Sequence, residues 1–221
     1  MIHLALDTPV AKPFRPMRLG VIGAGWLGSA VGSNWARAGH QVMLSSRHPS
    51  RLAPLANRLG KNVSTGTPRA AANFAEVVLI SVPYEPLPVL AEACGDALAG
   101  KVLLDACNPP WNPDHPLAQE CASRGVGPTT QRIFADARVV RCFSAVDASR
   151  IAESWGRSSV PLAVPLAGDD AEAVAIAAQL VHDADCQPLV VGGLDTGVLF
   201  QRGTPPFRAN TTLERLRRTF G

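Results

Sequence analysis

The chain has 221 residues, 47% hydrophobic and 18% charged, which is a globular composition and enough for one domain with a small addition. Its apolar runs are shorter than the ~20 residues of a membrane helix, and residues 1–16 lack the apolar stretch of a secretory signal. Its five cysteines are widely spaced with no Cys-x-x-Cys pair, which argues against a zinc site or a disulfide framework and fits the reducing cytoplasm.

The net charge of +3 conceals an asymmetry between the two parts of the chain. Residues 1–75 hold nine Lys/Arg and one acid, whereas residues 76–221 hold twelve Lys/Arg and seventeen acids. The basic part predicts an anionic ligand. Nucleic acid is not expected, because the basic residues form no runs and aromatic residues make up only 5%.

The chain begins with an expected extended arm (1–16), followed from residue 17 by short apolar runs that alternate with helical patterns. Expected strands and helices, in order, are a strand at 18–22, a helix at 27–38, a strand at 41–44, a helix at 49–59, a short strand near residue 63, a helix at 68–74, a strand at 76–82, a helix at 86–99 and a strand at 101–106. This alternation predicts βαβ units and a parallel sheet with helices on both faces.

Beyond a Pro-rich loop at 108–116 the pattern is looser. The expected elements are helices at 116–124 and 128–136, strands at 138–146 and 158–167, a helix at 169–182, a strand at 188–191 and an irregular final 28 residues. The predicted fold is α/β: a Rossmann-type doubly wound parallel sheet over residues 17–150, with a small α/β C-terminal part over 151–221.

A Gly-x-Gly-x-x-Gly motif follows the first expected strand and opens the first helix, which is the context that gives the motif meaning. The glycines would permit a tight turn, backbone approach to a pyrophosphate, and close helix–strand packing. The helix N-terminus would offer free N–H groups to the phosphates. The predicted cofactor-binding residues here are Gly23, Ala24, Gly25, Trp26, Leu27 and Gly28.

The end of the second expected strand indicates which dinucleotide binds. An NAD-binding chain usually carries an acidic residue there, but this strand ends in Ser45-Ser46-Arg47, with Arg51 one helical turn later. Two guanidinium groups and a serine hydroxyl suit a 2′-phosphate. The sequence therefore predicts NADP(H).

Two further strand ends would border the nicotinamide half of the cofactor. Val82 and Pro83, followed by Tyr84, leave one strand, and Asn108 and Pro109 leave the next. Because ligands bind outside the carboxyl ends of parallel strands, these residues are predicted walls and polar contacts, although the prolines also suit simple strand termination.

No catalytic dyad or metal site is predicted. The only tyrosine is Tyr84 and no lysine lies four residues after it, which excludes a Tyr-x-x-x-Lys reductase dyad. The histidines at 3, 40, 48, 115 and 182 are expected at the surface or, for His115, in a loop-structural role. Trp111 is expected to stack on an acceptor ring or to cover the core, and Cys107 and Cys142 are expected to be inert core thiols.

At this point the sequence resembles the coenzyme F420-dependent NADP oxidoreductases. The segments that carry the resemblance are GVIGAGWLGSAVGSNWARAGHQVMLSSRHPSRL, EVVLISVP at 76–83, VLLDACNP at 102–109, VVRCFSAV at 139–146 and the segment 160–194, so that it covers about residues 17–195. It departs where Ala24 replaces a hydroxyl residue of some members, where Ser144 replaces a common asparagine, and in the tail after Leu194.

The resemblance implies hydride transfer between NADPH and a deazaflavin acceptor such as F420, by ring alignment in a dry cleft and without a protein nucleophile. It places the 2′-phosphate on Ser46, Arg47 and Arg51, implies that the C-terminal part over 151–221 completes the acceptor pocket, and implies a homodimer. Three alternatives stay open: a β-hydroxyacid or imino-acid reductase, an NADPH-dependent flavin or ferric reductase, and an NADPH-binding redox sensor without turnover. The first is disfavoured because hydroxyacid dehydrogenases need a catalytic lysine in their C-terminal domain, and no lysine follows Lys101 in this sequence.

Overall fold

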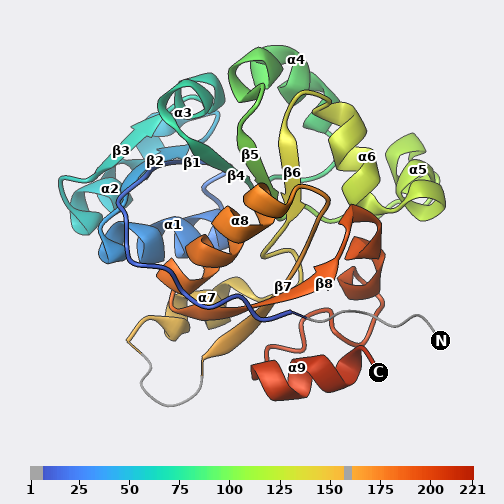
Figure 1. Ribbon diagram of the computed structural model, residues 1–221. Coiled ribbons are helices and arrows are strands. Elements are labelled where there is room, and N and C mark those ends of the chain that lie inside the picture. The colour runs from blue at the N-terminus through green and yellow to red at the C-terminus, as the bar shows by residue number, and fades with distance from the viewer. Residues whose placement is uncertain (1–6, 157–160) are drawn as a thin grey trace.

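The computed structural model describes residues 7–156 and 161–221, which form an eight-stranded sheet with helices on both faces (Figure 1). The strand order is β3-β2-β1-β4-β5-β6-β7-β8, and the first six strands are parallel. The strands are β1 (Arg18–Ile22), β2 (Gln41–Ser45), β3 (Val63–Gly66), β4 (Val77–Ile80), β5 (Val102–Asp105), β6 (Arg138–Arg141), β7 (Leu162–Gly168) and β8 (Cys186–Gly192). The predicted doubly wound α/β fold is confirmed.

Apolar side chains alternate across the central strands and build a core on each face of the sheet. Val77 and Leu79 of β4 face α1, α7 and α8, whereas Val78 and Ile80 face α3, α4 and α6. The helices are α1 (Trp26–Ala38), α2 (Ala53–Leu59), α3 (Pro68–Phe74), α4 (Leu87–Leu98), α5 (Pro116–Arg124), α6 (Val126–Ile133), α7 (Ala148–Ser154), α8 (Ala171–Asp183) and α9 (Leu213–Thr219). Within the described ranges, none of these helices is long and apolar enough to cross a bilayer.

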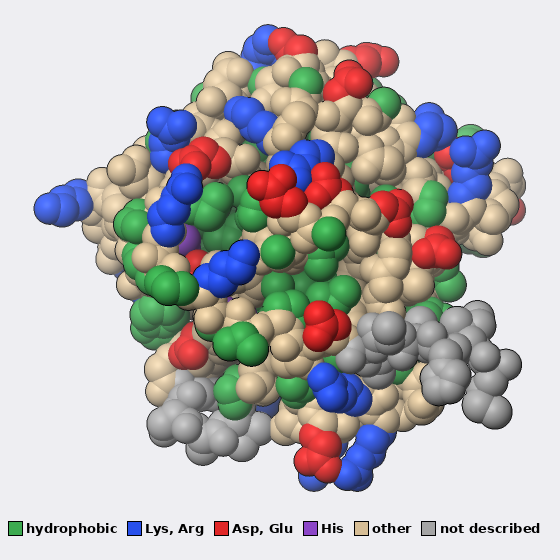
Figure 2. Space-filling model, in the orientation of Figure 1, with side chains coloured by type: hydrophobic (Ala, Val, Ile, Leu, Met, Phe, Trp, Pro, Cys, Tyr) green, Lys and Arg blue, Asp and Glu red, His purple; other side chains and the backbone are tan. Residues whose placement is uncertain are grey.

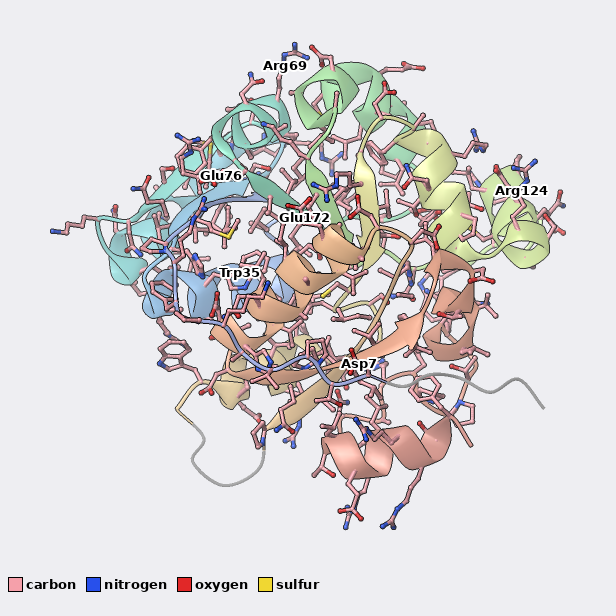
Figure 3. The ribbon with its side chains drawn as sticks, in the orientation of Figure 1. Asp7, Trp35, Arg69, Glu76, Arg124 and Glu172 are labelled. Atoms are coloured by element: carbon pink, nitrogen blue, oxygen red, sulfur yellow. The ribbon has the colours of Figure 1, made fainter. Side chains whose placement is uncertain are left out.

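Trp35 is the largest buried side chain and joins α1 to α8. It is fully buried, its indole Nε1–H donates to Leu180 O at 2.8 Å, and its ring lies edge-on to Phe143 with a centroid separation of 6.1 Å (Figure 3). The indole donor is satisfied inside the core, so this contact fixes α8 over the sheet.

The C-terminal part continues the same sheet. Strand β7 runs antiparallel to β6, and β8 then pairs in parallel with β7. The sequence did not predict α7, which lies in a segment taken as a boundary, or the final helix α9, which lies in a tail expected to be irregular. The predicted helix at 49–59 divides into a 3₁₀ turn η1 (Pro49–Leu52) and α2, while a second 3₁₀ segment, η2 (Leu194–Phe200), follows β8. The first residues of the strand predicted at 158–167 lie outside the described residues.

The described part of the N-terminal arm, residues 7–16, crosses α8 and reaches the free edge of β8 (Figure 1). Asp7 forms an antiparallel bridge with Val190, with N···O distances of 3.1 and 2.9 Å, and Pro9 O lies 2.9 Å from Nε2 of His182. The arm therefore covers part of an edge strand that would otherwise offer unpaired backbone groups.

The prediction that His40 lies at the surface is wrong. His40 is fully buried at the end of α1, with Nε2 3.0 Å from Asp183 of α8 and Nδ1 accepting from the backbone N–H of Met17 at 3.1 Å. Phe14 of the arm lies edge-on to its ring. The turn after Ala38 thus folds inward, because these partners satisfy both ring nitrogens.

Candidate functional site

The site is formed by the loops that follow β1, β2, β4, β5 and β6, at the carboxyl ends of these parallel strands. Ile22 at the end of β1 stands opposite Ser45 of β2 and Ile80 of β4, and Ile80 stands opposite Asp105 of β5. This register places the glycine loop beside the β2, β4, β5 and β6 loops, at the edge where ligands bind in such sheets.

The three glycines of the loop have three different environments. Gly23 has a φ of 95°, and a Cβ there would lie 2.3 Å from Ser81 O. A Cβ on Gly28 would lie 2.3 Å from Gly23 O, so any side chain would force α1 away from the loop. A Cβ on Gly25 would meet nothing within 4 Å, so the backbone here faces open space that a ligand can approach.

The backbone donors of the loop divide into used and free groups. The N–H groups of Gly23 and Ala24 both donate to Ser45 O, at 3.3 and 2.9 Å. The first hydrogen bond of α1 runs from Ser29 N to Gly25 O, so the donors before it have no helical acceptor. The groups left to face an anion at this helix terminus are the N–H groups of Trp26, Leu27 and Gly28.

The two serines at the end of β2 are engaged within the protein. Ser45 is fully buried and its hydroxyl donates to Val21 O at 2.9 Å, so only its backbone reaches the site. The half-buried Ser46 accepts from the backbone N–H of His48 at 3.0 Å, which shapes the turn and leaves its hydroxyl proton free to donate.

Arg47 and Arg51 are exposed beside this turn, Arg51 on η1. Among the described residues, neither guanidinium has an ion-pair or hydrogen-bond partner, and the sequence contains no Asp or Glu from Thr8 to Ala75. Two uncompensated cations thus stand at the end of β2, where the adenosine ribose lies in dinucleotide-binding folds.

The β4 and β5 loops border the other half of the edge. Val82 is half-buried and Pro83 is exposed after β4, while Asn108 and Pro109 are half-buried after β5. The Asn108 amide donates to Ser144 O at 3.0 Å, which ties the β5 loop to the β6 loop. Within the described part of the chain, Asn108 Oδ1 and Ser144 Oγ are buried without a hydrogen-bond partner.

A buried polar network lies directly beneath these loops. The side chains of Arg141 and Asp105 are fully buried, with Nη1 and Oδ2 2.8 Å apart, and Nη1 also donates to Cys107 O at 2.5 Å. Asp105 accepts further from Thr130 Oγ1 and from Cys107 N, both at 2.8 Å. The Tyr84 hydroxyl completes the chain, 2.9 Å from Thr130 Oγ1.

This network corrects the predicted place of Tyr84 and reveals residues that the sequence analysis missed. Tyr84 is 1% exposed, so it anchors the β4 loop from below and forms no wall of the site. Burial, then the nearby Asp105 charge, raises the pKa of Tyr84 well above its usual range, and burial does the same for Cys107. The missed signal was an acid or a cation at the end of an otherwise apolar strand, as in VLLD and RVVR.

Trp111 and His115 lie in the loop after β5. Trp111 is 81% exposed and does not cover the core, and the Arg202 guanidinium stacks over its ring at 3.4 Å from the centroid. His115 has the predicted loop role, since its Nδ1 accepts from Leu117 N at 3.2 Å and caps α5.

All five cysteines are free and buried, including Cys107 and Cys142, which were expected to be core thiols. Over residues 7–156 and 161–221, no group of three His, Cys, Asp or Glu side chains is placed to hold a metal ion.

Comparison with known proteins agrees with this geometry. Residues 18–109 match the family described as NADP oxidoreductase, coenzyme F420-dependent. The predicted family resemblance is confirmed. The F420-dependent NADP reductase of Methanothermobacter thermautotrophicus is 27% identical to the chain over 203 residues, which is 86% of this chain and 87% of that reductase.

Other relatives extend the comparison beyond the F420-dependent family. A glycerol-3-phosphate dehydrogenase [NAD(P)+] of Azorhizobium caulinodans is 30% identical over 208 residues, but this chain spans only 58% of its length. Among solved structures, a protein of Arthrobacter sp. FB24 proposed to be an F420-dependent NADP reductase has a TM-score of 0.68 at 26% identity, covering 81% of this chain and 86% of its own. A hypothetical protein of Sinorhizobium meliloti has a TM-score of 0.78 at 24% identity, covering 89% and 95%, and supports the fold alone.

Proposed function

We propose that the chain binds NADP(H), with the pyrophosphate at the N-terminus of α1 and the 2′-phosphate between Arg47 and Arg51. The observation that carries this proposal is the pair of unpartnered guanidiniums at the end of β2 in a stretch without acids. The open face at Gly25 and the free N–H groups of the first turn of α1 fit the pyrophosphate.

The proposed reaction is hydride transfer between NADPH and a deazaflavin acceptor of the F420 type. The nicotinamide supplies the hydride when bound, so the chain needs no nucleophile and only has to align two rings and exclude water. The loops that carry Val82 and Asn108 would flank the nicotinamide. Arg141 and Asp105 join the ends of β6 and β5, and Tyr84 anchors the β4 loop through Thr130. The names of the relatives support the acceptor class; homodimerisation and a cytoplasmic location stay predictions.

Anaerobic oxidation of NADPH, followed with F420 and with FMN in parallel, tests the acceptor. NADPH-dependent bleaching of F420 alone is the expected result. Turnover with FMN alone would assign the protein to the flavin or ferric reductases instead. Tight NADPH binding without turnover of either acceptor would contradict the hydride-transfer proposal and favour a redox sensor.

Cofactor selectivity tests the proposed phosphate site separately. The double variant Arg47→Ala/Arg51→Ala should weaken NADPH binding by about 2–4 kcal/mol, or roughly 30- to 1,000-fold, and leave NADH binding unchanged. Arg58→Ala is the matched control, since Arg58 is an exposed arginine on the neighbouring α2. An equal loss for NADPH and NADH would refute the assignment of the 2′-phosphate.

A further inference from the structure

A cavity lies at the opposite edge of the sheet from the glycine loop. Its volume is about 630 Å³, and it opens between the N-terminal arm, the amino ends of β4, β5 and β6, and α8. Figure 2 shows this face, where apolar side chains lie in a hollow and charged side chains surround it. The carboxyl edge described above contributes nothing to its lining, so the proposed hydride transfer does not use it.

The arm forms a fixed wall of this cavity. The backbone N–H of Lys12 donates to the Gln179 side chain of α8 at 2.6 Å, and Arg15 pairs with Glu76 at 3.0 Å. Met17, which follows the arm and also lines the cavity, donates its backbone N–H to Nδ1 of the buried His40. These contacts hold the arm on both sides of the opening.

The floor of the cavity is apolar and aliphatic. It is formed by Met17, Val77, Val102, Ala175 and Ile176, and no aromatic side chain is among the lining residues. A flat aromatic ring would find no stacking partner here, whereas an aliphatic body would be removed from water against these side chains.

The charges around the floor are unequal. Four cations and two acids line the cavity: Lys12, Arg15, Lys101, Arg138, Glu76 and Glu172. The two acids are already paired, Glu76 with Arg15 at 3.0 Å and Glu172 with Arg138 at 2.7 Å, and both lie on the face shown in Figure 3.

Lys12 and Lys101 both line the cavity, and neither ammonium group has a carboxylate partner among the described residues. In the described part of the chain, the Nζ of Lys101 donates to the backbone O of Ala72 on α3, at 2.7 Å, and its other two N–H groups have no acceptor. Burial, with a smaller repulsion from Arg18, lowers the pKa of Lys101, as expected for a cation without a counter-charge. These are two of only three lysines in the chain, so their meeting at one cavity is a specific feature of this sequence.

We propose that this cavity binds a small amphipathic anion, a carboxylate with an aliphatic body, whose charge is neutralised by Lys12 and Lys101 and whose body lies on the floor beside Ile176. The volume is within the range of small-molecule sites, which combine apolar walls with a few placed polar groups. This cavity is separate from the proposed NADP(H) site, because the two lie at opposite edges of the sheet.

Isothermal titration with octanoate tests the proposal, with octylamine as the charge-reversed probe and acetate as the probe without an aliphatic body. Octanoate should bind saturably at one site, and octylamine and acetate should bind at least tenfold more weakly. The variant Lys12→Gln/Lys101→Gln should lose octanoate affinity at least tenfold, whereas Lys61→Gln, which changes the third lysine outside the cavity, should stay within twofold of wild type.

Two further measurements distinguish a loss of octanoate binding from misfolding, and binding at this cavity from binding elsewhere on the protein. Lys12 is exposed on the arm, so Lys12→Gln alone keeps the core intact and should still weaken octanoate. In methyl NMR spectra the Ile176 signal should shift on adding octanoate, while that of Ile133, on the other face of the sheet, should not. Absence of saturable octanoate binding, equal binding of octylamine, or an unmoved Ile176 signal would each overturn the proposal.

Discussion

Replacing Asp105 by Asn removes one charge from a fully buried ion pair while preserving the shape of the side chain. The carboxylate of Asp105 accepts hydrogen bonds from Arg141, from Thr130 and from Cys107 N. The variant would present an NH₂ group to some of these donors. It would also leave the charge of Arg141 unbalanced, although Nε and Nη2 of that arginine already have no partner among the described residues.

The expected cost is about 3–5 kcal/mol of unfolding free energy, the range for breaking a buried pair from one side. For a chain of 221 residues this corresponds to a fall in Tm of roughly 6–20 °C. Equilibrium unfolding in urea, followed by tryptophan fluorescence, measures the free energy directly.

The double variant Asp105→Asn/Arg141→Met decides whether the cost comes from the unpaired charge. Without either charge, the double variant should be more stable than the sum of the single losses predicts, by about 1–3 kcal/mol. Additive losses, or a cost below about 1 kcal/mol for Asp105→Asn alone, would refute the reasoning that this pair is a strongly coupled buried unit.

Three other perturbations have defined outcomes. Arg138 holds the pKa of Asp170 well below its usual range, so the stability contributed by Asp170 is complete above about pH 4 and is lost as the pH falls further. The Tm difference between wild type and Asp170→Asn should therefore shrink from pH 7 to pH 3. A Tm difference that stays constant with pH would contradict the ion pair. Asn34→Ala should cost about 2–3 kcal/mol in urea unfolding, because the Asn34 amide donates to buried backbone carbonyls such as Ala184 O at 3.1 Å; an unchanged midpoint would show that these carbonyls find other donors. Trp111→Ala should raise the KM for a deazaflavin about two- to tenfold by loss of ring stacking and leave the KM for NADPH unchanged, whereas equal KM changes would exclude an acceptor-side role.

The amino-terminal half of the fold could be predicted because its signals are local. The glycine motif specifies a strand, a turn and a helix within a few residues, and Gly23 and Gly28 make the close contacts that the motif requires. Continuous apolar runs such as Val77–Ile80 are typical of strands buried on both faces, and they lie in the centre of the sheet.

The rest depends on partners that are distant in the sequence. His40 lies in a turn that looks exposed, and its burial depends on Met17, 23 residues earlier, and on Asp183, 143 residues later, which satisfy its two ring nitrogens. Arg141 looks like an exposed strand end until Asp105 is placed beside it on the neighbouring strand. Helix α7 has only seven residues, too few for a periodic pattern, and is stabilised by packing against α1.

The docked arm also constrains the order in which the chain can reach its final form on the ribosome. Residues 7–12 are synthesised before the rest of the described chain, but groups that hold them belong to its last quarter: Asp7 pairs with Val190, Pro9 contacts a residue 173 positions later and Lys12 binds one 167 positions later. At translation rates of about 5–20 residues per second, that separation leaves the arm without its binding surface for roughly 10–30 s. The arm is therefore made before the sheet that it covers and is among the last segments to dock, and its docking marks the completion of α8 and β8.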